Sequence, residues 1–159
     1  MFTGDTYTLL HVAISLVGIA SGLIVGFGLV ASKRLDVSTG VFLGTTLATS
    51  ATGFGFPFDH ILPSHIVGAI SIVVLAVAIV ARYSGRMKGG WRATYVIAAM
   101  LAFYFNVFVL VVQLFQKVPA LKELAPTQSE PPFAITQLAI LVILLAWTVL
   151  AAKRFRPIA

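Results

Sequence analysis

Five long apolar segments make up most of this chain, and only short polar stretches separate them. They cover residues 7–31, 41–56, 63–83, 92–116 and 133–152. A hydrocarbon core about 30 Å thick needs about 20 helical residues to cross it, and four of the segments reach that length. The second is shorter, so it crosses only if it tilts, thins the bilayer or is shielded by its neighbours. The pattern predicts an all-α, polytopic membrane protein, with residues 1–159 forming a single five-helix transmembrane bundle.

The basic residues orient this predicted bundle. Only Lys117 and Lys122 fall on one side of it, whereas the other nine of the eleven Lys and Arg residues fall on the opposite side. Because basic connections stay in the cytoplasm, we expect the N-terminus outside and the C-terminus inside, which requires an odd number of crossings. Among the acidic residues, Asp36 alone falls on the basic side. The nine basic residues are Lys33, Arg34, Arg82, Arg86, Lys88, Arg92, Lys153, Arg154 and Arg156.

Composition supports the membrane assignment and limits the choice of partners. Hydrophobic residues make up 59% of the chain and charged residues 10%, and the mean hydropathy of +1.01 lies far from that of soluble proteins. Topology accounts for the net charge of +6, so we expect anionic lipids at the cytoplasmic face rather than nucleic acid. The absence of cysteine excludes disulfides and thiolate metal sites.

Small residues mark the expected helix contacts. Helices in lipid associate through small side chains and a few polar groups, and Gly18, Gly22 and Gly26 form two overlapping GxxxG pairs. Gly44 and Gly68 continue the pattern on the second and third segments. These contacts serve packing within one chain, a homo-oligomer or a larger membrane complex. The second segment is short and rich in hydroxyls, so we expect it at the centre of the bundle.

Four polar residues fall at one depth near the outer surface, each on a different predicted helix. At 1.5 Å per residue, each of them lies within about one turn of the outer end of its helix. Polar groups in membrane helices usually face inward, so we expect these four to converge. They are His11, His65, Gln113 and Gln137.

Several functions fit this outer ring. The four side chains can form a structural cap or a ligand site. His11 and His65 suit the axial positions of haem b, and His with Gln suits a quinone. A copper or zinc site would use His11, His60 and His65. A small transporter is a further alternative, although no charged residue lies deep in any span. No catalytic motif appears, so we expect a non-catalytic binding or accessory protein.

Three segments around the outer face resemble a group of small bacterial integral membrane proteins of undefined function. The resemblance implies a bacterial inner membrane and carries over no catalytic residue or ligand. The segments are TGFGFPFDHILPSHIVG (52–68), FNVFVLVVQLFQKVPAL (105–121) and LAPTQSEPPF (124–133).

Overall fold

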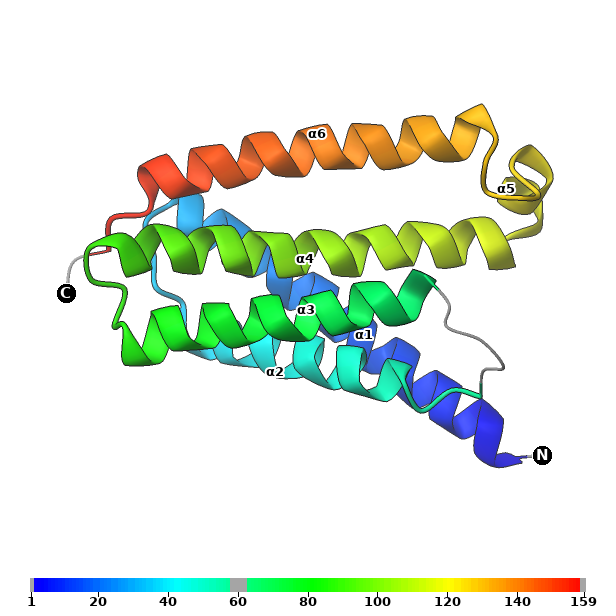
Figure 1. Cartoon of the computed structure of the whole chain (residues 1–159), viewed down its shortest axis with the longest axis horizontal. Coiled ribbons are helices and arrows are strands. Elements are labelled where there is room, and N and C mark those ends of the chain that lie inside the picture. The colour runs from blue at the N-terminus through cyan, green and yellow to red at the C-terminus, as the bar shows by residue number, and fades with distance from the viewer. Residues whose placement is uncertain (1, 58–62, 158–159) are drawn as a thin grey trace.

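Long helices of alternating direction form the whole molecule (Figure 1). The computed structural model describes residues 2–57 and 63–157, with side chains from Thr6 onward. Within these residues all regular structure is helical, as predicted, and no strand occurs. The helices are α1 (Phe2–Val30), α2 (Asp36–Gly53), α3 (Pro63–Ile79), the π-helix η1 (Val80–Ser84), α4 (Gly90–Lys117), α5 (Pro119–Leu124) and α6 (Pro131–Arg154).

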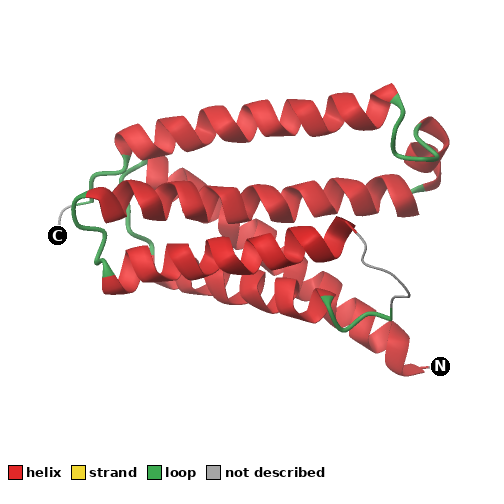
Figure 2. Cartoon of the chain, viewed as in Figure 1, coloured by secondary structure: helices red, strands yellow, loops and turns green. Residues whose placement is uncertain are grey.

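The two ends of the molecule differ in their connections (Figure 2). One end, here the α5 end, holds the start of α1, the short helix α5 and the start of α6. The opposite end holds the α1–α2 and η1–α4 connections and the end of α6. We call it the basic end because its exposed side chains include Lys33, Arg34, Arg86, Lys88, Lys153, Arg154 and Arg156.

Four helices within the described ranges are long and apolar enough to cross a membrane. They are Thr6–Val30 of α1, Pro63–Ser84 of α3 with η1, α4 and α6. The chain is therefore compatible with a small, multi-pass integral membrane protein. Helix α2 does not meet the same criterion, because Thr and Ser side chains dilute its apolar residues. It also begins at Asp36, five residues before the predicted start, since Leu35 closes the preceding turn in the left-handed conformation (φ 42°).

Helix α4, rather than α2, occupies the centre of the bundle. It packs against α1, α3 and α6, and to a smaller extent against α2. Its alanines let these neighbours approach closely, and Ala102 is fully buried. The central position expected for α2 is wrong, because one of its faces is exposed. The hydroxyls of α2 partly satisfy themselves: Thr45 donates to the carbonyl of Val41 at 2.7 Å, which removes much of the need for burial.

The glycine stripe of α1 faces the bundle but receives side chains rather than a neighbouring backbone. A β-carbon placed on Gly22 would lie 2.5 Å from the Phe103 ring, and one on Gly26 would lie 2.7 Å from Trp147. The spaces beside Gly22 and Gly26, which we call glycine sockets, hold aromatic rings from α4 and α6. At Gly18 the nearest atom is the Thr45 hydroxyl at 3.2 Å.

The two remaining glycines differ from each other. A β-carbon on Gly68 would lie 3.4 Å from the Phe54 ring, so Gly68 is at a close contact. Gly44 differs from the prediction: it lies on the exposed face of α2, and no atom lies within 4 Å of its β-carbon position.

The basic end contains Arg82, a buried residue that the charge pattern assigned to the basic side of the bundle. The Arg82 side chain is 1% exposed, and its Nη2 lies 2.5 Å from Oδ1 of Asp36 and 3.1 Å from the carbonyl of Arg34. The π-helix η1 brings Arg82 into the interior, where its guanidinium lies 5.0 Å from the Tyr95 ring centroid. Asp36, the acid on the basic side, therefore neutralises a buried cation.

Candidate functional site

A cavity of about 430 Å³ lies between α1, α2, α3 and α4 towards the α5 end. Its lining includes His11, His65 and Gln113, which are three of the four residues of the predicted outer ring. Asn106, from deeper in α4, lines the same cavity. Apolar walls with a few polar groups are typical of small-molecule sites.

Gln137, the fourth residue of the predicted ring, lies elsewhere. It is buried at the contact between α6 and α4, and its Nε2 donates to the carbonyl of Phe108 at 3.2 Å. Helix α6 packs on α4 and α1, and Gln137 is not among the described residues that line the cavity. Depth alone therefore grouped Gln137 with residues that lie on another side of α4.

The protonation pattern of His11 follows from its neighbour. The hydroxyl of Thr52 donates its single hydrogen to the carbonyl of Ala48 at 2.7 Å. Its oxygen lies 2.8 Å from Nδ1 of His11 and must accept there. The Nδ1 atom of neutral His11 therefore carries the proton, and Nε2 keeps a free lone pair. The edge-on ring of Phe56, with its centroid 5.0 Å away, also holds the imidazole.

His65 is held by aromatic packing on the other wall of the cavity. Its ring stacks on Phe54 with centroids 5.7 Å apart and an interplanar angle of 29°. Gly68, three residues further along α3, leaves the space that the Phe54 ring occupies. The side chain is buried and lines the cavity from α3.

Hydroxyl and amide groups form the deep end of the cavity. Nδ2 of Asn106 donates to the Thr46 hydroxyl at 3.0 Å, and Ser50 donates to Ser71 at 3.2 Å. The predicted outer ring did not include Asn106. The signal was present, because Asn106 and Gln113 are two turns apart and share a face of α4.

The cavity has a basic character. Lys117 lies at its rim, and none of the described residues that line it is Asp or Glu. His60, the third ligand of the predicted metal site, lies outside the described residues. Among those that are described, no group of three or more His, Asp or Glu side chains is placed to hold a metal. His11 and His65 are the two imidazoles among the described residues that line this cavity.

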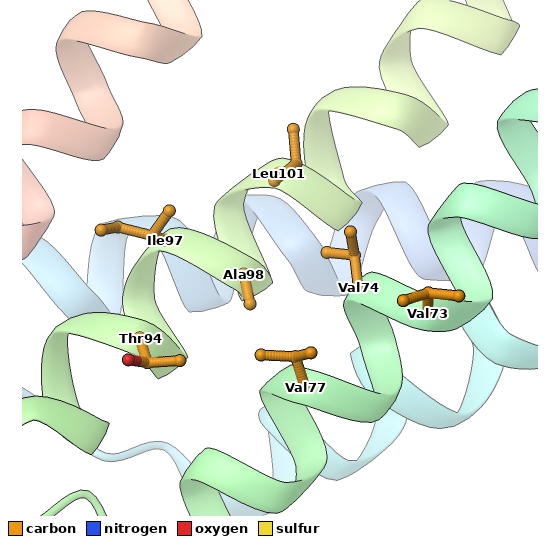
Figure 3. Close-up of a pocket in the computed structure, with 7 residues that line it drawn as sticks. All are labelled: Val73, Val74, Val77, Thr94, Ile97, Ala98 and Leu101. Atoms are coloured by element: carbon orange, nitrogen blue, oxygen red, sulfur yellow. The ribbon is translucent and has the colours of Figure 1, made fainter.

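A second hollow, on the surface between α3 and α4, is almost wholly apolar (Figure 3). Its single polar side chain, Thr94, donates its hydroxyl to the carbonyl of Gly90 at 3.1 Å. Its chemistry fits the hydrocarbon of surrounding lipid. The lining residues are Val73, Val74, Val77, Thr94, Ile97, Ala98 and Leu101.

Comparison with known proteins gives no indication of function, so the functional conclusion depends on the cavity. No protein-family model, no curated protein and no solved structure matches the chain. The resemblance of residues 52–68, 105–121 and 124–133 to small bacterial membrane proteins therefore stays a prediction.

Proposed function

We propose that this protein is a small integral protein of the bacterial inner membrane that binds a small ligand and has no catalytic activity of its own. The supporting observation is the cavity of about 430 Å³ that His11, His65, Gln113 and Asn106 line. His11 offers a lone pair at Nε2, and Gln113 and Asn106 offer amides that donate and accept. A ligand of moderate size that forms hydrogen bonds fits this combination.

The proposal includes an orientation with five crossings, in which α2 is the fifth. The α5 end faces outward and the basic end faces the cytoplasm. Seven exposed cationic side chains at the basic end support this orientation. These side chains would contact anionic lipid headgroups, each contributing about 1 kcal/mol near the surface. Helix α2 would cross because α1 and α3 shield much of its polar face.

Ligand retention tests the proposal. His11→Ala and His65→Ala should each release a species that copurifies with the wild-type protein, as measured by native mass spectrometry from mild detergent. The double variant should do little more than either single variant, because both side chains act on one ligand. Gln137→Ala is the matched control, since it removes a buried polar group outside the cavity. Equal retention by all variants would contradict the proposal.

A membrane redox protein is the second candidate, with haem b or a quinone in the same cavity. The observation that favours it is the tautomer of His11: a metal-binding imidazole usually donates its other N–H to a neighbour, and Nδ1 already donates to Thr52. The absorption spectrum of the purified protein tests the haem, because bound haem gives a Soret band. Chromatography of extracted lipids tests the quinone, and a colourless, quinone-free protein would remove this candidate.

A further inference from the structure

We infer that the cavity is an aqueous vestibule that opens at the α5 end, ends at Asn106 near the middle of the membrane, and admits small neutral or anionic polar solutes. The inference deepens the proposed function, because it depends on the α5 end facing outward and names the class of ligand. It also bears on transport, since a vestibule of this kind is half of a permeation route.

The positions of the lining residues show how deep the cavity reaches. On α4 the polar lining residues run from Lys117 to Asn106. At a rise of 1.5 Å per residue, these eleven steps along α4 span about 16 Å. A hydrocarbon core is about 30 Å thick, so the cavity reaches roughly half-way across it.

Polar side chains occur at successive turns along this depth. Thr8, His11 and Ser15 lie on one line of α1, while Gln113 and Asn106 lie on one line of α4. Polar residues inside a membrane protein face its interior or a water-filled space. A wall with polar groups at every level is suited to a hydrated solute, because each lost hydrogen bond with water can be replaced.

The cavity has room and polar partners for water. The side chains of Ser15, Ser64 and Gln113 are among its polar lining. A volume of about 430 Å³ holds about 14 waters at roughly 30 Å³ each, and the lining offers the polar partners that bound water needs.

Aromatic side chains close the vestibule below Asn106. Phe103 and Phe42 lie about one turn further towards the basic end on α4 and α2, and their ring centroids are 6.4 Å apart. Both rings pack over Gly22 of α1. The vestibule is thus a dead end in this conformation, and a solute that enters from the α5 end stops at the Asn106–Thr46 pair.

The charge of the lining selects the solute. Lys117 stands at the rim, and the described lining contains no carboxylate to attract a cation. Lys117 attracts an anion and opposes the entry of a cation, whereas a neutral molecule with hydrogen-bonding groups meets no such charge effect.

Single cysteines test the vestibule directly, because the native chain has none. Ser15→Cys changes one atom of the lining and preserves its size, and Asn106→Cys probes the deep end. Ile143→Cys on α6 is the lipid-facing control, and Ala99→Cys is the control buried beyond the Phe42–Phe103 pair. The variants are reconstituted in vesicles and treated with membrane-impermeant methanethiosulfonates that carry either a negative or a positive charge.

We expect both vestibule cysteines to be labelled, and both control cysteines to stay unlabelled on the same timescale. Relative to a free thiol, the anionic reagent should react with Ser15→Cys about fourfold faster than the cationic one, as a unit charge about 10 Å away in water predicts. Labelling of Ser15→Cys no faster than Ile143→Cys would overturn the vestibule, and a preference for the cationic reagent would overturn its selectivity. Ligand retention is measured separately, so a dry cavity that still holds a ligand would leave the proposed function standing.

Discussion

At the scale of single residues, the smallest side chains of α1 determine where the largest side chains of its neighbours lie. Gly22 accommodates Phe103, and Gly26 accommodates Trp147. The GxxxG spacing was visible in the sequence, but the aromatic partners were not. They come from helices more than 70 residues away, and their rings enter these sockets only once the helices pack.

The glycine sockets give a matched pair of substitutions. Gly22→Leu places a branched side chain where the Phe103 ring already lies, and overpacking of this kind costs about 1–3 kcal/mol or more. We expect a lower melting temperature in detergent and loss of the monodisperse peak in size-exclusion chromatography. Gly44→Leu is the control, because its side chain enters open space. An equal fall in melting temperature in both variants would mean that loss of the glycine backbone, rather than crowding of the socket at Gly22, lowers stability.

The Asp36–Arg82 pair gives a second residue-scale prediction. Asp36→Asn leaves the buried Arg82 guanidinium without its anionic partner, and hydrogen bonds to charged groups contribute about 1.5–3 kcal/mol. Because Asp36 itself is 68% exposed, we expect the lower part of that range for the loss in unfolding free energy, measured by denaturant titration in detergent. Arg34→Gln removes an exposed cation that pairs with the same Asp36 carboxylate. It should change the free energy of unfolding by less than about 0.5 kcal/mol.

At the scale of elements, the long apolar runs predicted the helices, because length and hydropathy decide whether a segment crosses a membrane. The short helix α5 was not among the predicted segments, although Pro119 suits its first turn. The π-helix η1 at Val80–Ser84 was not predicted either. It contains Arg82, whose long-range pairing with Asp36 local periodicity does not contain.

The start of α6 contains a carboxylate with a local structural role. Glu130 accepts hydrogen bonds from the hydroxyl of Thr127 at 2.8 Å and from the backbone amides of Thr127 and Ser129 at 3.2 and 3.1 Å. Desolvation acts to raise the pKa of Glu130, but these bonds outweigh it, and the pKa lies below its ordinary value of 4.5. The carboxylate is therefore fully charged when it caps this turn at neutral pH.

This shift predicts how the turn responds to pH. Because the folded-state pKa is lowered, the stabilisation is complete above the ordinary pKa and is lost as pH falls through the lower folded value. Hydrogen exchange should show protected amides at Thr127 and Ser129 near pH 6, with protection, corrected for intrinsic exchange, disappearing in acid. Glu130→Gln should weaken that protection near pH 6 and remove its dependence on pH. Protection that is independent of pH in the wild-type protein would contradict this role.

At the scale of the whole molecule, charge separates the two ends of the bundle. The basic end carries the seven exposed cationic side chains, whereas the α5 end has both Lys and Glu. The sequence alone allowed this separation to be predicted, because the order of the apolar segments fixes which connections share a side. Convergence on the cavity was only partly predictable. Depth along the helices grouped His11, His65 and Gln113, but it carried no information on the rotation that sends Gln137 to another side of α4.

Topology mapping tests the orientation. A reporter that is active only in the cytoplasm should be active when it is fused after Ala159. A single cysteine in place of Glu123, on α5, should react with an impermeant reagent from outside the cell. Lys88→Cys should react only after the membrane is permeabilised, because the proposed orientation places the basic end in the cytoplasm. Opposite labelling of the two cysteines would reverse the proposed orientation and place the cavity on the cytoplasmic side.

The position of α6 has a consequence for biogenesis. This helix is the least buried of the four candidate spans, and its last turn is held where Arg92 donates to the carbonyls of Ala152 and Phe155 at 3.0 and 2.6 Å. The described cavity lining lies between Thr8 and Lys117 and therefore precedes α6 along the chain. During synthesis, the cavity walls can thus assemble in the membrane before α6 leaves the ribosome. Trp147 would then fill the open socket at Gly26 as a late, stabilising step.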